Sequence, residues 1–291
     1  MAEQEPSDVV RIALIQARAV EDPDENLGRT VASIEQAAAK GARIVCTQEL
    51  FRTRYFCQEE DARHFALAEP MPGETTEYLS DVARRLGIVL IASLFERRAP
   101  GLFHDTAIVL LPDGSEGGTY RKMHVPDDPR FHEKFYFTPG DRGFPVVETP
   151  FGRVGVLICW DQWFPEAARL EALAGAEILF YPTAIGTWTG ERERQASQHA
   201  AWQTVQRGHA IANGVFVAAA NRTGREDDIG FWGRSFVCRP DGSLAAEAGD
   251  EETVLLADVD PGAIGRAREG WPFLRDRRVD AYGGLTQRFL D

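Results

Sequence analysis

The sequence predicts an α/β protein built from two similar halves, and three observations support this. The chain opens with an apolar run, an alanine-rich stretch of helical periodicity and a second apolar run, which together indicate a β-α-β unit. The same order recurs over residues 153–181, and a Gly-Ala pair precedes the second strand in each half. No linker-like stretch separates the halves. We therefore expect residues 1–291 to form a single domain.

The predicted elements of the first half alternate between buried strands and helices that glycine ends. Gly41 and Gly87 each follow a helical stretch in the position where a helix commonly stops. A Pro-Asp-Gly turn marks a hairpin after them. In chain order, the elements are strand 9–16, helix 26–40, strand 42–47, helix 75–86, strand 88–93 and a hairpin of 105–111 with 118–121.

The second half is predicted to repeat this order and then to close the fold. Its elements are strand 153–159, helix 165–174, strand 175–181, helix 195–213, strand 215–221 and an antiparallel pair, 233–238 with 253–259, around a Pro-Asp-Gly turn at 240–242. The tail over residues 271–291 is polar, rich in arginine and without clear periodicity. We expect it to wrap the surface or to reach a neighbouring subunit.

Composition narrows the classes of function. A net charge of −13 argues against nucleic acid as the main partner, because phosphate binding needs a basic stripe. The start of the chain is polar and acidic, unlike a signal peptide, and no apolar run is long enough for a membrane span. The four cysteines are widely spread without a Cys-x-x-Cys pair, and the six histidines show no ligand spacing. We expect a reduced cytoplasmic protein with no membrane partner, no metal and no cofactor.

Cys159 is the first candidate for chemistry. It follows a short apolar strand, and Pro165 and Glu166 after it are typical of a helix start. Side chains at such a junction of an α/β sheet project into the crevice beyond the strand ends, where backbone N–H groups can bind an oxyanion. The thiol is therefore either a catalytic nucleophile or a small buried apolar group, and this stretch alone favours neither.

A thiol nucleophile needs a base, and acyl transfer needs positive charge near the developing oxyanion. Glu49 ends the 42–47 strand, the counterpart of Cys159 in the first half, and a partly buried carboxylate there has the character of a general base. Lys122 follows the strand ending at Arg121 and could stabilise a thiolate. Taken singly, Glu49 also fits a helix-capping or ion-paired carboxylate, and Lys122 a solvated charge.

Together these three residues carry a resemblance. Glu49 in Gln-Glu-Leu-Phe, Lys122 in Arg-Lys-Met-His-Val-Pro and Cys159 in Leu-Ile-Cys-Trp-Asp-Gln-Trp-Phe-Pro-Glu match the Glu-Lys-Cys pattern of the nitrilase superfamily of carbon–nitrogen hydrolases in order, spacing and flanking residues. The resemblance covers about residues 9–282, and the chain is most similar to N-carbamoylputrescine amidohydrolases. It implies an α-β-β-α sandwich of two mixed sheets with helices on the outer faces, and a homodimer or larger homo-oligomer.

The resemblance also implies a mechanism. Glu49 deprotonates Cys159, the thiolate attacks an amide or ureido carbonyl, and Lys122 with the backbone N–H of Trp160 holds the oxyanion. Glu133 corresponds to a second glutamate that positions the lysine. The implied reaction is hydrolysis of N-carbamoylputrescine to putrescine, carbon dioxide and ammonia, a step of polyamine biosynthesis. A β-ureidopropionase-like enzyme, an aliphatic amidase or a nitrilase is the alternative, and a non-catalytic binding protein of the same fold is a more distant one.

The substrate-binding residues are predicted from chemistry. No arginine directly follows the nucleophile, which favours a neutral or cationic substrate tail over an acidic one. Carboxylates and aromatic faces hold an ammonium group. The sequence departs from the resembled enzymes in a segment that bears on the choice of substrate. Thr187-Trp188-Thr189 stands where those enzymes have a Ser-Glu-Pro segment. The candidates for substrate binding are Tyr55, Asp161, Trp163, Trp188 and Glu191.

Overall fold

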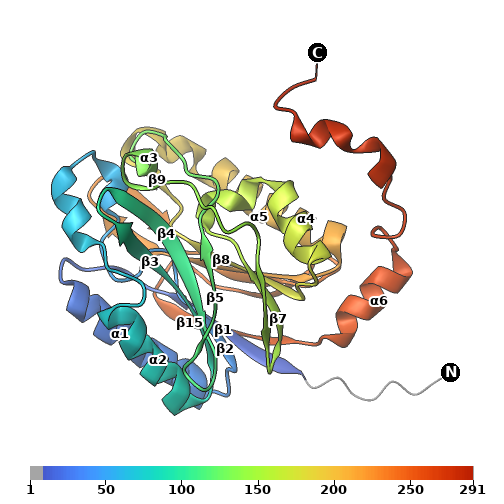
Figure 1. Cartoon of the computed structure of the whole chain (residues 1–291), viewed down its shortest axis with the longest axis horizontal. Coiled ribbons are helices and arrows are strands. Elements are labelled where there is room, and N and C mark those ends of the chain that lie inside the picture. The colour runs from blue at the N-terminus through green and yellow to red at the C-terminus, as the bar shows by residue number, and fades with distance from the viewer. Residues whose placement is uncertain (1–8, 291) are drawn as a thin grey trace.

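The fold is an α-β-β-α sandwich, as predicted. A computed structural model describes residues 9–290, without the side chains of residues 190–192. Two six-stranded mixed sheets lie between outer helices (Figure 1). The first sheet has the strand order β15 (Thr253–Val259), β1 (Val10–Gln16), β2 (Ile44–Cys46), β3 (Val89–Ala99), β4 (Leu102–Leu110), β5 (Glu116–Arg121). The second has the order β14 (Leu244–Glu247), β13 (Phe236–Cys238), β10 (Phe216–Asn221), β8 (Ile178–Thr183), β7 (Gly152–Val156), β6 (Val146–Thr149).

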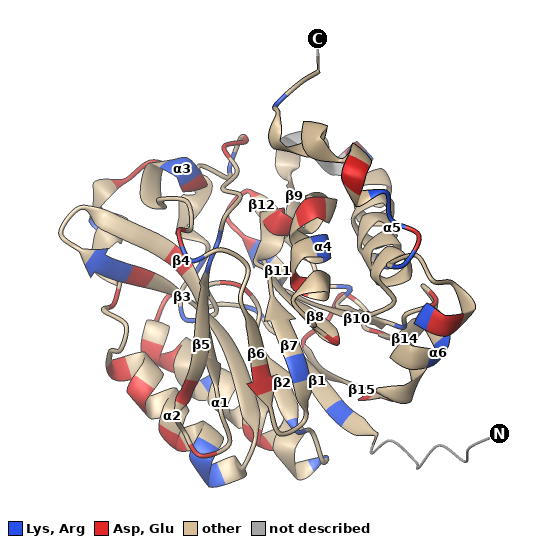
Figure 2. Ribbon diagram, turned by 45° about the vertical axis from the view of Figure 1, so that its right-hand side comes forward, with Lys and Arg blue, Asp and Glu red and all other residues tan. Residues whose placement is uncertain are grey.

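The helices cover the outer faces of the two sheets. On the first sheet lie α1 (Pro23–Ala39) and α2 (Glu74–Leu86), and an ion pair of 2.7 Å between Glu35 and Arg85 joins them. Figure 2 shows acidic and basic positions interspersed on this pair of helices. On the second sheet lie α4 (Pro165–Leu173) and α5 (Gln195–Asn213), while α6 (Gly262–Gly270) follows β15. No helix within residues 9–290 combines the length and apolar character that a bilayer crossing requires.

The period-two pattern of the first sheet separates two apolar layers. Ile12 and Leu14 of β1 point into a cluster that also contains side chains of the second sheet, such as Val154 and its neighbour Ile178. Ala13 and Ile15 face the other way, toward α1 and α2. Full burial of such an aliphatic side chain contributes about 1.5–3 kcal/mol, so both layers stabilise the sandwich.

Both halves contain the predicted β-α-β unit. β1 pairs in parallel with β2, and β7 pairs in parallel with β8. The hairpin of β4 with β5 is also confirmed, with Thr106 opposite Arg121. The helix over 195–213 has the predicted bounds, and Gly87 ends α2 with a φ of 64°.

The predicted closing pair of strands 233–238 and 253–259 is wrong. β13 instead pairs with β14, which follows directly after the turn at 240–242. β15 crosses to the first sheet and runs antiparallel to β1 over its whole length, from Val10 opposite Val259 to Gln16 opposite Thr253. The turn thus connects adjacent strands, and the last strand ties the two sheets together.

Two short segments complete the side of the molecule that carries the candidate site. A three-stranded sheet consists of β11 (Thr223–Glu226), β12 (Ile229–Trp232) and β9 (Gly186–Trp188). The short helix α3 (Glu133–Tyr136) and the 3₁₀ turns η1 (Phe56–Gln58) and η3 (Cys159–Trp163) follow the ends of sheet strands. These segments bring distant parts of the sequence to one edge of the sandwich.

Candidate active site

Cys159 lies at the strand-to-helix junction that the sequence predicted. β7 ends at Val156, and Cys159 is the first residue of η3 with a φ of 43°. A non-glycine residue in this left-handed region costs about 1–3 kcal/mol, so neighbouring contacts must hold it there. The residue is 6 % exposed and lines a cavity of about 320 Å³.

Glu49 and Lys122 form a fully buried ion pair. The Nζ of Lys122 donates to Oε1 of Glu49 at 2.7 Å, and neither side chain is exposed. The loop that carries Glu49 is fixed by the buried guanidinium of Arg222, which donates to the backbone oxygens of Glu49 and Leu50 at 3.0 and 2.9 Å. Because these hydrogen bonds already fix the loop, the carboxylate of Glu49 is held in place beforehand, and no free energy has to be spent on ordering it when a substrate reacts.

Glu133 is the second carboxylate on the same ammonium group. It begins α3, where Lys122 donates to Oε2 and the hydroxyl of Tyr55 donates to Oε1 at 2.6 Å. Burial, assisted by the charge of Glu49, raises the pKa of Glu133 to about 7 against the opposing effect of Lys122. Burial lowers the pKa of Lys122, but Glu133 and Glu49 outweigh it and hold this pKa well above the usual value. Lys122 is therefore a permanent cation.

The thiol of Cys159 is within the electrostatic influence of this cluster. Burial and the negative charge of Glu49 raise the pKa of Cys159 well above its usual value, while Lys122 lowers it. The resting group is therefore a thiol rather than a thiolate. A nucleophilic role for this thiol needs a base that accepts its proton, and Glu49 is a carboxylate of the same buried cluster.

Asp161 connects the segment of Cys159 to the segment of Lys122. Its carboxylate accepts hydrogen bonds from the backbone N–H of Ile158 at 2.8 Å, from the backbone N–H of His124 at 3.0 Å and from the hydroxyl of Tyr120 at 2.8 Å. The side chain of His124 also contacts it, at 2.7 Å. Asp161 thus restrains the residue before the nucleophile and the residue two positions after the lysine.

Two predicted substrate-binding residues do not reach the cavity. Asp161 is fully buried, and its oxygens are occupied by the contacts above. Tyr55 is also buried, with its hydroxyl on Glu133 and its backbone N–H on Glu226 at 2.6 Å. Neither lines the cavity. Asp161 points into the protein because it joins two backbone segments there, and Tyr55 does so because its ring packs against Phe131 and Phe231 while its hydroxyl binds Glu133.

The cavity wall is aromatic and nearly free of charge. Trp163 and Trp188 line it as predicted, and Glu133 and Cys159 lie on it. Asp128, which the sequence analysis did not single out, supplies a carboxylate from the loop before α3. Among the side chains described, the wall contains no lysine, arginine or histidine. The side chain of Glu191 lies outside the described residues. The aromatic residues of the wall are Phe131, Trp160, Trp163, Trp188 and Trp232.

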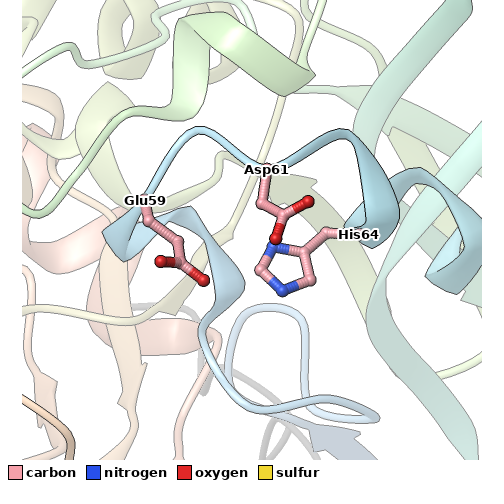
Figure 3. A group of neighbouring side chains, drawn as sticks. All are labelled: Glu59, Asp61 and His64. Atoms are coloured by element: carbon pink, nitrogen blue, oxygen red, sulfur yellow. The ribbon is translucent and has the colours of Figure 1, made fainter.

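Two groups of side chains have the spacing of metal ligands. The first is Glu49, Asp105 and Glu133, but the ammonium group of Lys122 lies within 4.0 Å of all three carboxylates and takes the place of a cation. The second is Glu59, Asp61 and His64 on a surface loop (Figure 3). There the Asp61 carboxylate is engaged by Arg63, which holds the pKa of Asp61 at about 2, and Nδ1 of His64 contacts Tyr136.

Comparisons with known proteins agree with this geometry. Residues 11–269 match the carbon-nitrogen hydrolase family profile. The chain belongs to this family. It is 43 % identical to N-carbamoylputrescine amidase of Solanum lycopersicum over 96 % of this chain and 95 % of the relative. It is 40 % identical to citrullinase of Francisella tularensis, over 96 % and 99 % of the two chains.

Structural similarity supports the same assignment. The crystal structure of a carbon-nitrogen hydrolase from Helicobacter pylori superimposes with a TM-score of 0.94 at 45 % identity, over 97 % of this chain and 100 % of that one. This carbon–nitrogen hydrolase is thus an enzyme of the nitrilase superfamily. The cavity over Cys159 is its candidate active site.

Proposed function

We propose that the hydrolase cleaves a terminal ureido group with Cys159 as nucleophile, Glu49 as general base, Lys122 as cationic stabiliser and Glu133 as the residue that positions Lys122. One observation carries the proposal: a thiol at the wall of an aromatic cavity is electrostatically coupled to a buried Glu–Lys–Glu cluster. An ion pair that served only the stability of the fold would not need a thiol in a strained backbone conformation beside it.

The reaction proceeds in two stages. Glu49 accepts the proton of Cys159, and the thiolate attacks the ureido carbon. Lys122 and the backbone N–H of Trp160 stabilise the oxyanion, and ammonia leaves with the proton from Glu49. A water molecule then gives a proton to Glu49 and attacks the S-carbamoyl intermediate, which restores the thiol. The released carbamic acid decomposes to carbon dioxide and the amine.

The cavity wall supports a substrate with a cationic tail, of which N-carbamoylputrescine is our preferred example. A carboxylate tail has no basic partner among the described wall residues, so burying it there would be unfavourable. An ammonium tail has Asp128 and the faces of Trp163 and Trp188. The same reasoning disfavours a carbamoyl amino acid or citrulline, each of which carries a carboxylate.

A substrate panel tests the proposed reaction. Ammonia release is measured with N-carbamoylputrescine, N-carbamoyl-β-alanine, citrulline, simple amides and nitriles. We expect kcat/KM to be highest for N-carbamoylputrescine. The variant Cys159→Ala should have no activity, whereas Cys57→Ala, which removes another buried thiol near the same charges, should retain it. An active Cys159→Ala protein would rule out the nucleophile, and a preference for citrulline or carbamoyl-β-alanine would rule out the cationic tail.

The proposed product suggests where the enzyme acts. Putrescine formation is a step of polyamine biosynthesis, and we place this step in the cytoplasm. All four cysteines are free and buried, a state that a reducing compartment maintains. We further propose that the sandwich is one domain, because the apolar layer between the sheets contains residues of both halves.

We also propose that the hydrolase forms a homodimer or larger homo-oligomer through the segment after α6, residues 271–290, called the C-terminal arm. The arm extends away from the sandwich (Figure 1). The arm also lies near α4, where burial and the positive charge of Arg277 lower the pKa of Arg169. Most of the large apolar side chains that remain exposed belong to the arm: Trp271, Phe273, Val279, Tyr282, Leu285, Phe289 and Leu290.

A further inference from the structure

Asp105 is a buried carboxyl group that lies beside the proposed catalytic residues and has no part in the reaction above. It lies on β4, and its backbone oxygen accepts the N–H of Lys122 at 2.9 Å. Its Oδ1 accepts the hydroxyl of Ser93 at 2.9 Å, and the oxygen of that hydroxyl accepts the N–H of Leu50 at 3.1 Å. Asp105 is therefore linked to both sides of the Glu49–Lys122 pair.

Two buried carboxylate oxygens in this cluster lack a hydrogen bond to any described residue. They are Oε2 of Glu49 and Oδ2 of Asp105, and the two carboxyl groups interact directly with each other. Two ionised carboxylates in contact would repel, and each would keep a desolvated oxygen without a donor. A single proton between these oxygens removes both penalties, because one group then donates and the other accepts.

The position of Lys122 decides which group holds the proton. Its Nζ is 2.7 Å from Glu49 but 3.7 Å from Asp105, so the ammonium group favours the ionised form of Glu49 more strongly. We propose that Asp105 is a positioning residue, a neutral carboxylic acid whose Oδ2 proton is donated in a hydrogen bond to Oε2 of Glu49. This inference rests on the proposed role of Glu49 as general base.

Two further observations support a neutral Asp105. If Glu49, Asp105 and Glu133 were all ionised, they would place three negative charges around the one ammonium group of Lys122 in a region without solvent. Burial, assisted by the charge of Glu49, raises the pKa of Asp105 well above its usual value despite Lys122. A neutral donor holds the Glu49 carboxylate in place without adding a negative charge that would oppose formation of the thiolate.

The test compares two replacements of Asp105 that keep its branched shape and differ in their capacity for hydrogen bonding. In Asp105→Asn the amide N–H₂ donates to Glu49 and the amide oxygen accepts from Ser93, so we expect kcat/KM within about threefold of wild type and an unchanged acidic limb of the pH–rate profile. Asp105→Leu has the same number of side-chain heavy atoms and the same branching, but it is bulkier and can neither donate nor accept a hydrogen bond. We expect its kcat to fall at least tenfold with little change in KM. Its acidic limb should move to higher pH, because the proton on Glu49 is no longer disfavoured.

The alternative states of Asp105 give opposite results. If Asp105 is ionised, Asp105→Asn removes a negative charge, and its acidic limb should move to lower pH or its activity should fall as far as that of Asp105→Leu. Either result, or full activity in a folded Asp105→Leu protein, overturns the inference. The pH dependence of Cys159 alkylation by iodoacetamide is measured in parallel. This readout needs no substrate, so it tests the role of Asp105 even if the preferred substrate is not hydrolysed.

Discussion

At the scale of single residues, the charge of Glu49 has two opposite effects on Cys159. In the proposed reaction it is the base that accepts the proton, but as a nearby negative charge it raises the pKa of the thiol. In Glu49→Gln the negative charge is lost while Lys122 remains, so we expect the thiol to ionise at lower pH. Hydrolysis should nevertheless fall by about a hundredfold or more, because no base remains to transfer protons.

The prediction is checked with two assays on one protein. Ammonia release reports the loss of the base, and the rate of iodoacetamide alkylation against pH reports the ionisation of the thiol, with Cys159→Ala as the blank. The midpoint of alkylation should move to lower pH in Glu49→Gln. A midpoint that stays in place or rises would show that Glu49 does not act on the sulfur.

Residue patterns predicted part of this cluster and missed the rest for physical reasons. Strand ends placed Glu49, Lys122 and Cys159 at one edge of the fold, and the structure brings Glu49 and Lys122 into contact. Asp105 was not singled out although it begins the predicted hairpin strand, because no register was predicted; the observed register, with Thr106 opposite Arg121, is what brings it to Lys122. The place of Asp128 on the cavity wall could not be predicted, since this residue lies in an irregular loop whose path is set by tertiary contacts. Whether Asp161 points into the cavity or the interior depends on the tight turn of η3, which no periodicity specifies.

At the scale of elements, Asp161 holds together two turns that come from different sheets. From its place in η3 it accepts hydrogen bonds from Ile158, the residue before η3, and from His124 in the segment that follows β5. In Asp161→Asn the size is kept but the charge is lost, and one amide N–H₂ faces a backbone N–H. We expect the free energy of unfolding to fall by about 2–4 kcal/mol, together with a loss of activity, because hydrogen bonds to a buried charge are among the strongest.

Tyr120→Phe serves as the matched variant for the hydrogen bonds that Asp161 accepts. It keeps the Asp161 charge and removes the hydroxyl that donates to Asp161 and accepts the N–H of Met123, so we expect a loss of about 1–2 kcal/mol in urea denaturation. Equal effects of the two substitutions would contradict the proposal that the Asp161 charge is the centre of the connection. So would an Asp161→Asn protein with wild-type stability and activity.

Local signals predicted the type of most elements better than their partners. The helix over 195–213 and the β4–β5 hairpin were recovered because their patterns depend on neighbours in sequence. The pairing of β15 with β1 joins residues more than two hundred positions apart, and no local turn signals it. β3 also continues to Ala99, beyond the predicted end at residue 93, because its partner β4 extends the hairpin.

At the scale of the whole molecule, the site combines groups from both sheets of the sandwich. Glu49 follows β2 and Lys122 follows β5 in the first sheet, whereas Cys159 follows β7 in the second. The proposed base and nucleophile therefore follow different strands of the two β-α-β units, since Glu49 follows the second strand of the first unit and Cys159 follows the first strand of the second. Docking of the sheets through the apolar layer is then a condition for activity as well as for stability.

The C-terminal arm allows the assembly of the molecule to be separated from its fold. A chain that ends at Gly270 keeps all strands of the two sheets and loses the exposed apolar side chains of residues 271–290. If the arm binds a second copy, this truncated protein should remain folded but elute as a monomer in size-exclusion chromatography with light scattering. The full chain should show a multiple of 32.3 kDa under the same conditions.

Point substitutions in the full-length chain separate the apolar contact from the length of the arm. Leu285 and Phe289 are 66 % and 80 % exposed, and replacing both with aspartate should shift the protein toward the monomer. Gln287→Asp adds one negative charge, where the double replacement adds two, at an exposed polar position between them and should leave the mass unchanged. A monomeric full-length protein at micromolar concentration would contradict the proposal, as would an unaltered oligomer after truncation. Because the arm lies outside the cavity, kcat per active site of a folded monomer then measures how far catalysis depends on assembly.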